Sequence, residues 1–159
     1  MKKFLLYDPK LLLYGFSILF FASYGQTFFI SLFNTEIRIF YNLSDGEFGL
    51  VYAIATLSSS FILISFAKLI DNLDLRVYSF IITLGFLFAC LGMVLLINNV
   101  LYLFLIIFML RFFGQGAMDH AGGTTMARYF GNDKGKALSV ATLGGMMGCL
   151  LYTSDAADE

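Results

Sequence analysis

The sequence contains few charged residues, and this scarcity excludes an ordinary soluble domain. Asp, Glu, Lys and Arg make up 13% of the 159 residues, whereas soluble domains carry about 25%. Hydrophobic residues make up 59%, and the mean hydropathy is +0.82, so water cannot be the solvent for most of this surface. Each bilayer crossing takes about 20 apolar residues, which leaves room for at most about six spans and no separate soluble domain.

Histidine and cysteine are also rare. The chain has one histidine and two cysteines, Cys90 and Cys149, whose spacing fits neither a metal site nor a disulfide framework. Membrane enzymes generally carry clustered His, Asp or Glu ligands or a nucleophile in a fixed motif, and one histidine cannot supply such a set. We therefore expect no enzymatic activity, no metal and no cofactor. The composition gives no indication of a nucleic-acid partner.

The apolar residues are gathered into segments long enough to be membrane helices. Asp8 and Pro9 have the order that starts a helix before the first segment. Ser44 and Glu47 have the spacing of a capping box before the second, and Asn99 separates the third from the fourth. The sequence thus predicts an all-α membrane protein with spans at residues 11–33, 45–67, 77–97, 100–127 and, cut short, 137–148.

The basic residues predict how these spans are oriented. If the N-terminus is cytoplasmic, eight of the ten Lys and Arg residues fall on the inside, and Arg38 alone falls on the outside. Cytoplasmic segments carry the excess of Lys and Arg in membrane proteins. We therefore expect a multi-pass integral membrane protein with a cytoplasmic N-terminus, in a bacterial inner (plasma) membrane.

The last eleven residues, 149–159, differ from the rest of the chain. The apolar pattern of the fifth segment stops there, and three of the eleven acidic residues lie in the last five positions. A soluble acidic tail is one explanation. The string also resembles the in-frame translation of a transposase-type sequencing adapter. We favour this second interpretation, in which the tail is non-native and the natural sequence ends at about Gly148.

Arg111 is the strongest functional signal in the sequence. It lies twelve residues after Asn99, about 18 Å along a helix, which places it near the centre of the bilayer. A charge there costs at least about 2.5 kcal/mol on insertion scales, so such groups generally face a bundle interior or a watery cavity. Gln115 shares the Arg111 face. In the alternative interpretation, Arg111 only orders the bundle by bonding to carbonyls of a facing helix.

Asp119 and His120 are candidate protonatable groups on the same span. Asp119 lies eight residues after Arg111, about 12 Å along the axis, so a direct ion pair within the helix is not expected and each charge needs a partner elsewhere. Histidine titrates near neutral pH without help. Alternatively, both groups lie hydrated near the cytoplasmic interface and have no role.

The first span carries a polar interruption at residues 24–27, close to the middle of the bilayer. Tyr24 and Gln26 are candidates for lining a substrate cavity. Helix packing explains Gly25 and Thr27 equally well, because small residues let helices approach closely.

These features together resemble the N-terminal half of a major facilitator superfamily transporter. In the loop between the second and third spans, Leu69, Asp71 and Arg76 match the family signature Gly-x-Leu-Ala-Asp-Arg-x-Gly-Arg-Arg/Lys. The sequence from Arg111 to Gly116 resembles the family's membrane-embedded arginine, which is often linked to proton coupling. Arg128 begins a stretch that resembles the connection between the fourth and fifth spans.

The resemblance implies a fold and a mechanism. The fold would be part of one six-helix half of a 12-helix transporter, with Asp71 capping a helix of the missing half. Arg76 would anchor the cytoplasmic side, and Arg128 would belong to the same gating region.

Two functions remain open on the sequence. The first is a secondary active transporter that is coupled to protons or another gradient, moves a small solute by alternating access, and binds it between two halves. The embedded cation favours an organic anion. Its partners would be the substrate, the lipid bilayer and the missing C-terminal half of the same chain, so the fragment alone would be inactive. The second is a structural subunit of a membrane complex without transport activity.

Overall fold

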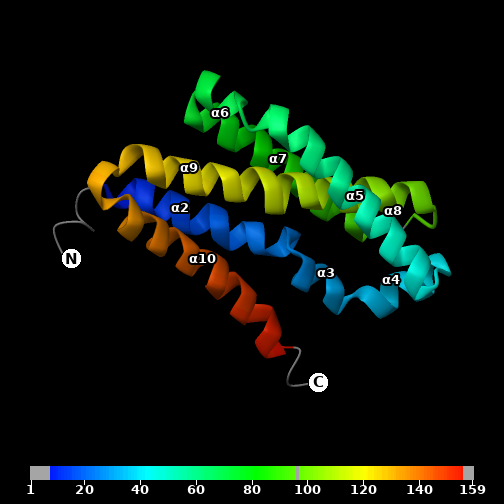
Figure 1. Ribbon diagram of the computed structural model, residues 1–159. Coiled ribbons are helices and arrows are strands. Elements are labelled where there is room, and N and C mark those ends of the chain that lie inside the picture. The colour runs from blue at the N-terminus through cyan, green and yellow to red at the C-terminus, as the bar shows by residue number, and fades with distance from the viewer. Residues whose placement is uncertain (1–7, 96, 156–159) are drawn as a thin grey trace.

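The computed structural model describes residues 8–95 and 97–155, and every element in these ranges is a helix (Figure 1). Four helical stretches are long and apolar enough to cross a membrane: Pro9–Leu32, Asp45–Asn72, Leu75–Val94 and Val100–Tyr129. An all-α membrane fold is therefore confirmed. The elements are α2 (Pro9–Ala22), η1 (Ser23–Gly25), α3 (Thr27–Leu32), α4 (Asn34–Tyr41), α5 (Asp45–Phe66), α6 (Leu69–Asn72), α7 (Leu75–Val94), α8 (Val100–Met109), η2 (Leu110–Met118), α9 (Asp119–Tyr129), η3 (Gly131–Asp133) and α10 (Lys134–Asp155).

The helix starts follow the capping residues in the sequence. The Asp8 side chain accepts a hydrogen bond from the Leu11 N–H at 3.0 Å. Ser44 and Glu47 form the predicted capping box, in which the Glu47 carboxylate accepts from the Ser44 N–H at 2.9 Å. The Asn99 side chain caps α8. Each cap satisfies backbone donors that a helix start leaves without an intrahelical partner.

The polar segment between the first and second spans is helical from Asn34 to Tyr41. α4 packs Ile37 and Tyr41 against Phe48 of α5, with Leu103 of α8 in the same buried cluster. It ends at Asn42, whose φ of 52° is left-handed, as is common just after a helix. The apolar side of this short helix explains why it stays folded outside the long spans.

α2, α9 and α10 form one side of the bundle (Figure 1). A side chain at Gly144 or Gly148 of α10 would overlap backbone atoms of α2. The Ser23 hydroxyl contacts the Gly145 carbonyl at 3.1 Å. Small residues therefore bring α10 close to the first span. α10 continues through Asp155, so the non-native origin of residues 149–159 stays a prediction.

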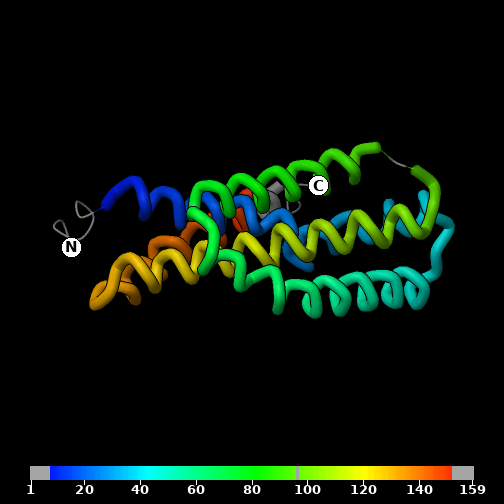
Figure 2. Tube along the Cα trace, turned by 90° about the horizontal axis from the view of Figure 1, so that it is seen from above, coloured from blue at the N-terminus to red at the C-terminus, as the bar shows by residue number. Residues whose placement is uncertain are grey.

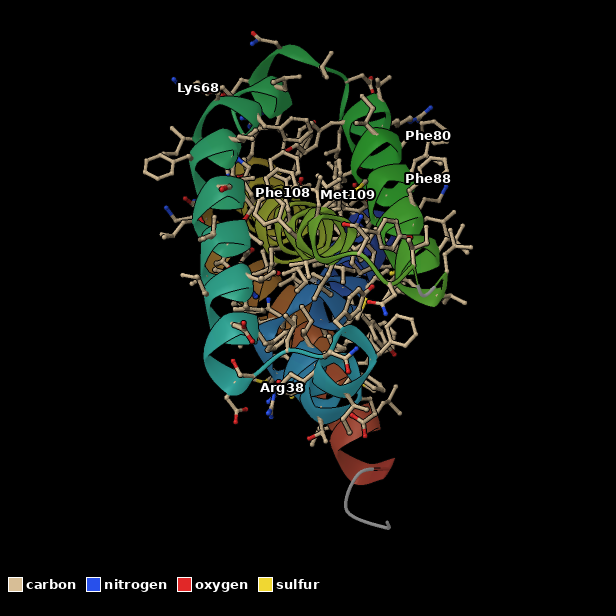
Figure 3. The ribbon with its side chains drawn as sticks, turned by 90° about the vertical axis from the view of Figure 1, so that its right-hand side faces the viewer. Arg38, Lys68, Phe80, Phe88, Phe108 and Met109 are labelled. Carbon is tan, nitrogen blue, oxygen red and sulfur yellow. The ribbon has the colours of Figure 1, made fainter. Side chains whose placement is uncertain are left out.

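α5 and α7 flank the fourth span on its other sides (Figures 2 and 3). Figure 3 shows Phe108 and Met109 between these two helices, whereas Phe80 and Phe88 point away from the bundle. Both outward phenylalanines are exposed, as expected for side chains that face lipid. The fourth span is the most enclosed. In its apolar 18-residue part, 44% is buried inside the bundle, against 11% for the stretch Asp45–Asn72.

Candidate functional site

The first span is not one continuous helix. α2 tightens into the 3-10 turn η1, and Gln26 is then extended, with φ of −78° and ψ of 156°, before the chain becomes helical again at Thr27. The Ser23 hydroxyl bonds to the Phe20 carbonyl at 2.7 Å just before this break. The polar interruption seen in the sequence is therefore a break in the helix.

The fourth span is also irregular where it faces the break in the first span. From Leu110 to Met118 it is a π-helix, which is wider than an α-helix and is frequent at functional sites when it occurs as a short insert. A Cβ on Gly25 would lie 2.7 Å from the Leu110 carbonyl oxygen and 2.8 Å from the Gly114 Cα. The broken segment and the π-helix thus touch backbone to backbone, and only glycine fits at Gly25.

Arg111 lies at this crossing and is only 8% exposed. Its Nη1 donates to Thr27 Oγ1 at 3.0 Å and to the Gly25 carbonyl at 3.4 Å. Its Cζ lies 5.4 Å from the centroid of the Tyr52 ring, within the range of a cation–π interaction. The Tyr52 hydroxyl also donates to Thr27 Oγ1, at 2.8 Å. The guanidinium is therefore held by the first span and by α5.

Asp119 has its partner on the first span as well. Its Oδ2 accepts from Gln26 Nε2 at 2.9 Å. Gln26 and Thr27 are neighbours in sequence, so the break presents one residue to the carboxylate and the next to the guanidinium. Arg111 and Asp119 therefore both have hydrogen-bond partners outside their own helix.

The remaining predicted residues of the fourth span make fewer contacts. Gln115 Oε1 is buried without a hydrogen-bond partner among the described residues. His120 is partly buried, and within the same ranges it forms no hydrogen bond or ion pair. Neither side chain joins the Arg111 and Asp119 contacts.

Tyr24 precedes Gly25 at the break and lies beside an apolar groove. It lines this groove, which has a volume of about 870 Å³, together with residues of α4 and α7. Besides Tyr24, the polar side chains in the groove wall are Glu36, Tyr41, Thr83 and Cys90. The groove wall includes Leu110 and Met118 of the π-helix but not Arg111, Gln115 or Gln26.

The predicted gating residues are partly brought together at the other end of the bundle. Arg128 of α9 forms an ion pair with Asp71 of α6, and its Nη1 donates to the Ile70 carbonyl at 3.4 Å. Arg76 takes no part in an ion pair within residues 8–95 and 97–155. Its backbone N–H donates to Asp74 Oδ1 at 2.7 Å, which caps the start of α7.

Sequence reasoning missed Tyr52. It lies in an apolar run of the second span, where a tyrosine is compatible with lipid-facing or core positions. The available signal is general: a buried tyrosine hydroxyl needs a hydrogen-bond partner. Nothing in the spacing of the sequence identifies Thr27, 25 residues earlier, as that partner.

No group of three or more His, Cys, Asp or Glu residues in the described part of the chain could hold a metal ion. Comparison with protein families gives one match: the model described as Major Facilitator Superfamily matches residues 11–154. Comparisons with curated proteins and with solved structures give no match.

Proposed function

This chain belongs to the Major Facilitator Superfamily of membrane transporters, and from that premise we propose that it is the first part of a secondary active carrier for a small organic anion. The carrier would work by alternating access, driven by protons or another gradient. Its N-terminus would be cytoplasmic, in a bacterial inner membrane.

One observation carries the choice of an anion: Arg111 is buried and forms no ion pair with another described residue. The ion pairs found among the described residues are Arg38–Asp45, Arg128–Asp71 and Lys136–Asp133. Arg111 has hydrogen bonds and an aromatic face but no carboxylate against it. The neutral groups that hold Arg111 do not compensate its charge, and Asp119 acts on it only from beyond ion-pair distance. A buried charge in a bilayer is costly. An anionic solute would supply that compensation.

Asp119 supports coupling to a proton gradient. It is the acidic group nearest in sequence to Arg111 on the same span, and its hydrogen bond to Gln26 links it to the residue beside Thr27. A carboxyl group can hold or release a proton while it keeps such an amide partner. In the proposed mechanism, protonation at Asp119 and anion binding at Arg111 act on the same break in the first span. His120 remains a candidate relay group.

The Asp71–Arg128 ion pair supports a gate at the end of the bundle opposite α4. The pair connects the short helix α6 to α9, so it joins the second and fourth spans where the chain leaves the apolar region. Separation of the two side chains would let those ends move apart. Arg76, which is exposed and next to the α7 cap, would anchor the same side.

The missing half of the carrier would cover the apolar groove and the outer faces of α5 and α10. Exposed large hydrophobic residues occur on α5 at Leu50, Ile54, Leu57 and Phe61, and lipid or further helices can cover them. Sequencing the source DNA further downstream tests whether the gene encodes this missing half. We expect roughly 250 further residues with a second helical half, whereas a stop codon soon after Gly148 would favour a structural subunit.

The functional test uses the extended gene with Arg111→Lys. Lysine keeps the charge but loses the planar fork and the stacking on Tyr52, so uptake of organic anions into cells or vesicles should fall strongly. Arg38→Lys is the matched control, because Arg38 lies on α4 and pairs with Asp45. Unchanged uptake by the Arg111→Lys protein would remove Arg111 from the mechanism.

A further inference from the structure

Arg111 uses only one part of its guanidinium to contact the protein. The hydrogen bonds to Thr27 Oγ1 and to the Gly25 carbonyl are both donated by Nη1, and the Tyr52 hydroxyl interacts with the same guanidinium. Nε is buried and has no partner in the ranges that the structure describes. A guanidinium has five N–H donors in a fixed plane. The edge formed by Nε and Nη2 is therefore left without a hydrogen bond to those residues.

Tyr52 and Thr27 fix the direction of that edge. The Arg111 guanidinium lies over the Tyr52 ring, with Cζ 5.4 Å from the ring centroid. Thr27 Oγ1 accepts from both Arg111 Nη1 and the Tyr52 hydroxyl, at 3.0 Å and 2.8 Å. The ring contact and the hydrogen bond both act on the guanidinium end of the side chain. Together they hold the side chain in one orientation, although they come from different helices.

We propose that Tyr52 and Thr27 are positioning residues that present the Nε–Nη2 edge of Arg111 to a single carboxylate group of the transported anion. This inference rests on the proposed function, and it narrows the substrate class from organic anions to carboxylates. The two parallel N–H groups of this edge match the two oxygens of a carboxylate. A halide has no second acceptor atom for the fork.

The charge of the site distinguishes a carboxylate from a phosphate. Both can accept two parallel hydrogen bonds from arginine. A phosphate dianion, however, would bring more negative charge than one buried cation compensates, and burying the excess charge is unfavourable.

The test observes the Arg111 side chain directly in the 159-residue protein. The chain has four arginines, Arg38, Arg76, Arg111 and Arg128, so labelling arginine nitrogen gives four Nε signals in a nuclear magnetic resonance spectrum. The protein is placed in lipid nanodiscs, and Arg111→Lys identifies the Arg111 signal. Sodium propionate and inorganic phosphate are then titrated separately. We expect propionate to shift the Arg111 signal saturably and phosphate to bind at least about tenfold more weakly.

Two variants test the role of the positioning residues, and a third serves as their control. Tyr52→Phe keeps the ring over Arg111 but removes the hydroxyl, and Thr27→Val removes the shared acceptor. Each should weaken propionate binding by about fivefold, the effect of one neutral hydrogen bond. Tyr102→Phe is the matched control, because it removes a tyrosine hydroxyl that donates to the Gly92 carbonyl and makes no contact with Arg111. It should leave binding unchanged.

The outcomes separate this inference from the proposed function. Saturable propionate binding with equal affinity in all three variants would overturn the positioning role and leave the anion site standing. Tighter binding of phosphate than of propionate would overturn the carboxylate class. A signal from Arg111 that neither anion moves would overturn the anion site and this inference together. If Tyr52→Phe fails to fold, as judged by the other three arginine signals, Thr27→Val decides the positioning role.

Discussion

The second and fourth spans differ in regularity and in surroundings. α5 is helical without interruption from Asp45 to Phe66, and few of its residues are buried. The fourth span is the most buried one, and it changes from α-helix to π-helix over the residues that surround Arg111. In a bilayer, irregular backbone and charge are tolerated only where protein or a watery cavity surrounds them. The comparison shows that both occur in the span with the most protein around it.

The largest effect should come from adding a methyl group where the irregular segments touch. Gly25→Ala places a Cβ against backbone atoms of Leu110 and Gly114, which cannot move aside as a side chain would. We expect a loss of about 3 kcal/mol in the free energy of unfolding, the upper range for overpacking. The measurement is helix content during titration of detergent micelles with sodium dodecyl sulfate.

The matched change on the regular span is Gly49→Ala. No atom lies within 4 Å of a Cβ at Gly49, and alanine is the better helix former by up to about 1 kcal/mol. The free energy of unfolding should therefore stay the same or rise. Equal losses for the two alanine variants would contradict the close contact between the first and fourth spans.

The next effect has the opposite sign. Arg111→Leu removes a buried charge that lacks an ionic partner, so the protein should become more stable by about 2 kcal/mol in the same titration. The exposed Lys68→Leu at the end of α5 should change stability by less than about 0.5 kcal/mol. A strong destabilisation by Arg111→Leu would mean that Arg111 serves to hold the bundle together, as in the alternative read from the sequence.

Gln26→Leu should have a moderate effect, because it leaves the partly buried Asp119 carboxylate without its hydrogen bond. We expect a loss of about 1.5 kcal/mol. In the double variant with Asp119→Leu, the loss should be smaller than the sum of the two single losses. Ser60→Ala on α5 is the control, since its exposed hydroxyl bonds only within its own helix. Additive losses would show that Gln26 and Asp119 are not coupled.

The smallest effect should be confined to the start of α5. Ser44→Ala removes the side-chain acceptor of the capping box and should lower stability by about 1 kcal/mol. Glu47→Gln keeps a side chain that can bond back to the Ser44 N–H, so it should cost less. Amide hydrogen exchange will show whether faster exchange is limited to the first turn of α5. Faster exchange around Arg111 would contradict the separation of the two regions.

The sequence predicted the features that depend on neighbouring residues. The caps at Asp8, Ser44 and Asn99 are local hydrogen bonds, and the four apolar stretches are visible as runs of sequence. The helix α4 could have been predicted from the spacing of Ile37 and Tyr41, four residues apart on one face. It was missed because the charged residues around it suggest a connection between spans.

The details of the site could not be predicted in this way. Hydropathy is averaged over a window, so it does not reveal that the chain is extended at Gln26 or that the helix widens at Leu110. Both irregularities lie where two segments about 90 residues apart in sequence touch, and Gly25 and Gly114 give only a weak signal of that contact. The pairing of Tyr52 with Thr27 likewise depends on the tertiary arrangement. The sequence identified the polar residues, and the fold determined which of them meet.

The contact between Gly25 and Gly114 also gives the two spans a point about which they can tilt. The two glycines bring no side chain of their own between the backbones, so they oppose a small tilt about this point less than larger residues would. In such a tilt, atoms near this point, such as the Arg111 guanidinium, would move little, whereas the far ends of the two spans would move more. Those ends carry α4 on one side and the Asp71–Arg128 pair on the other.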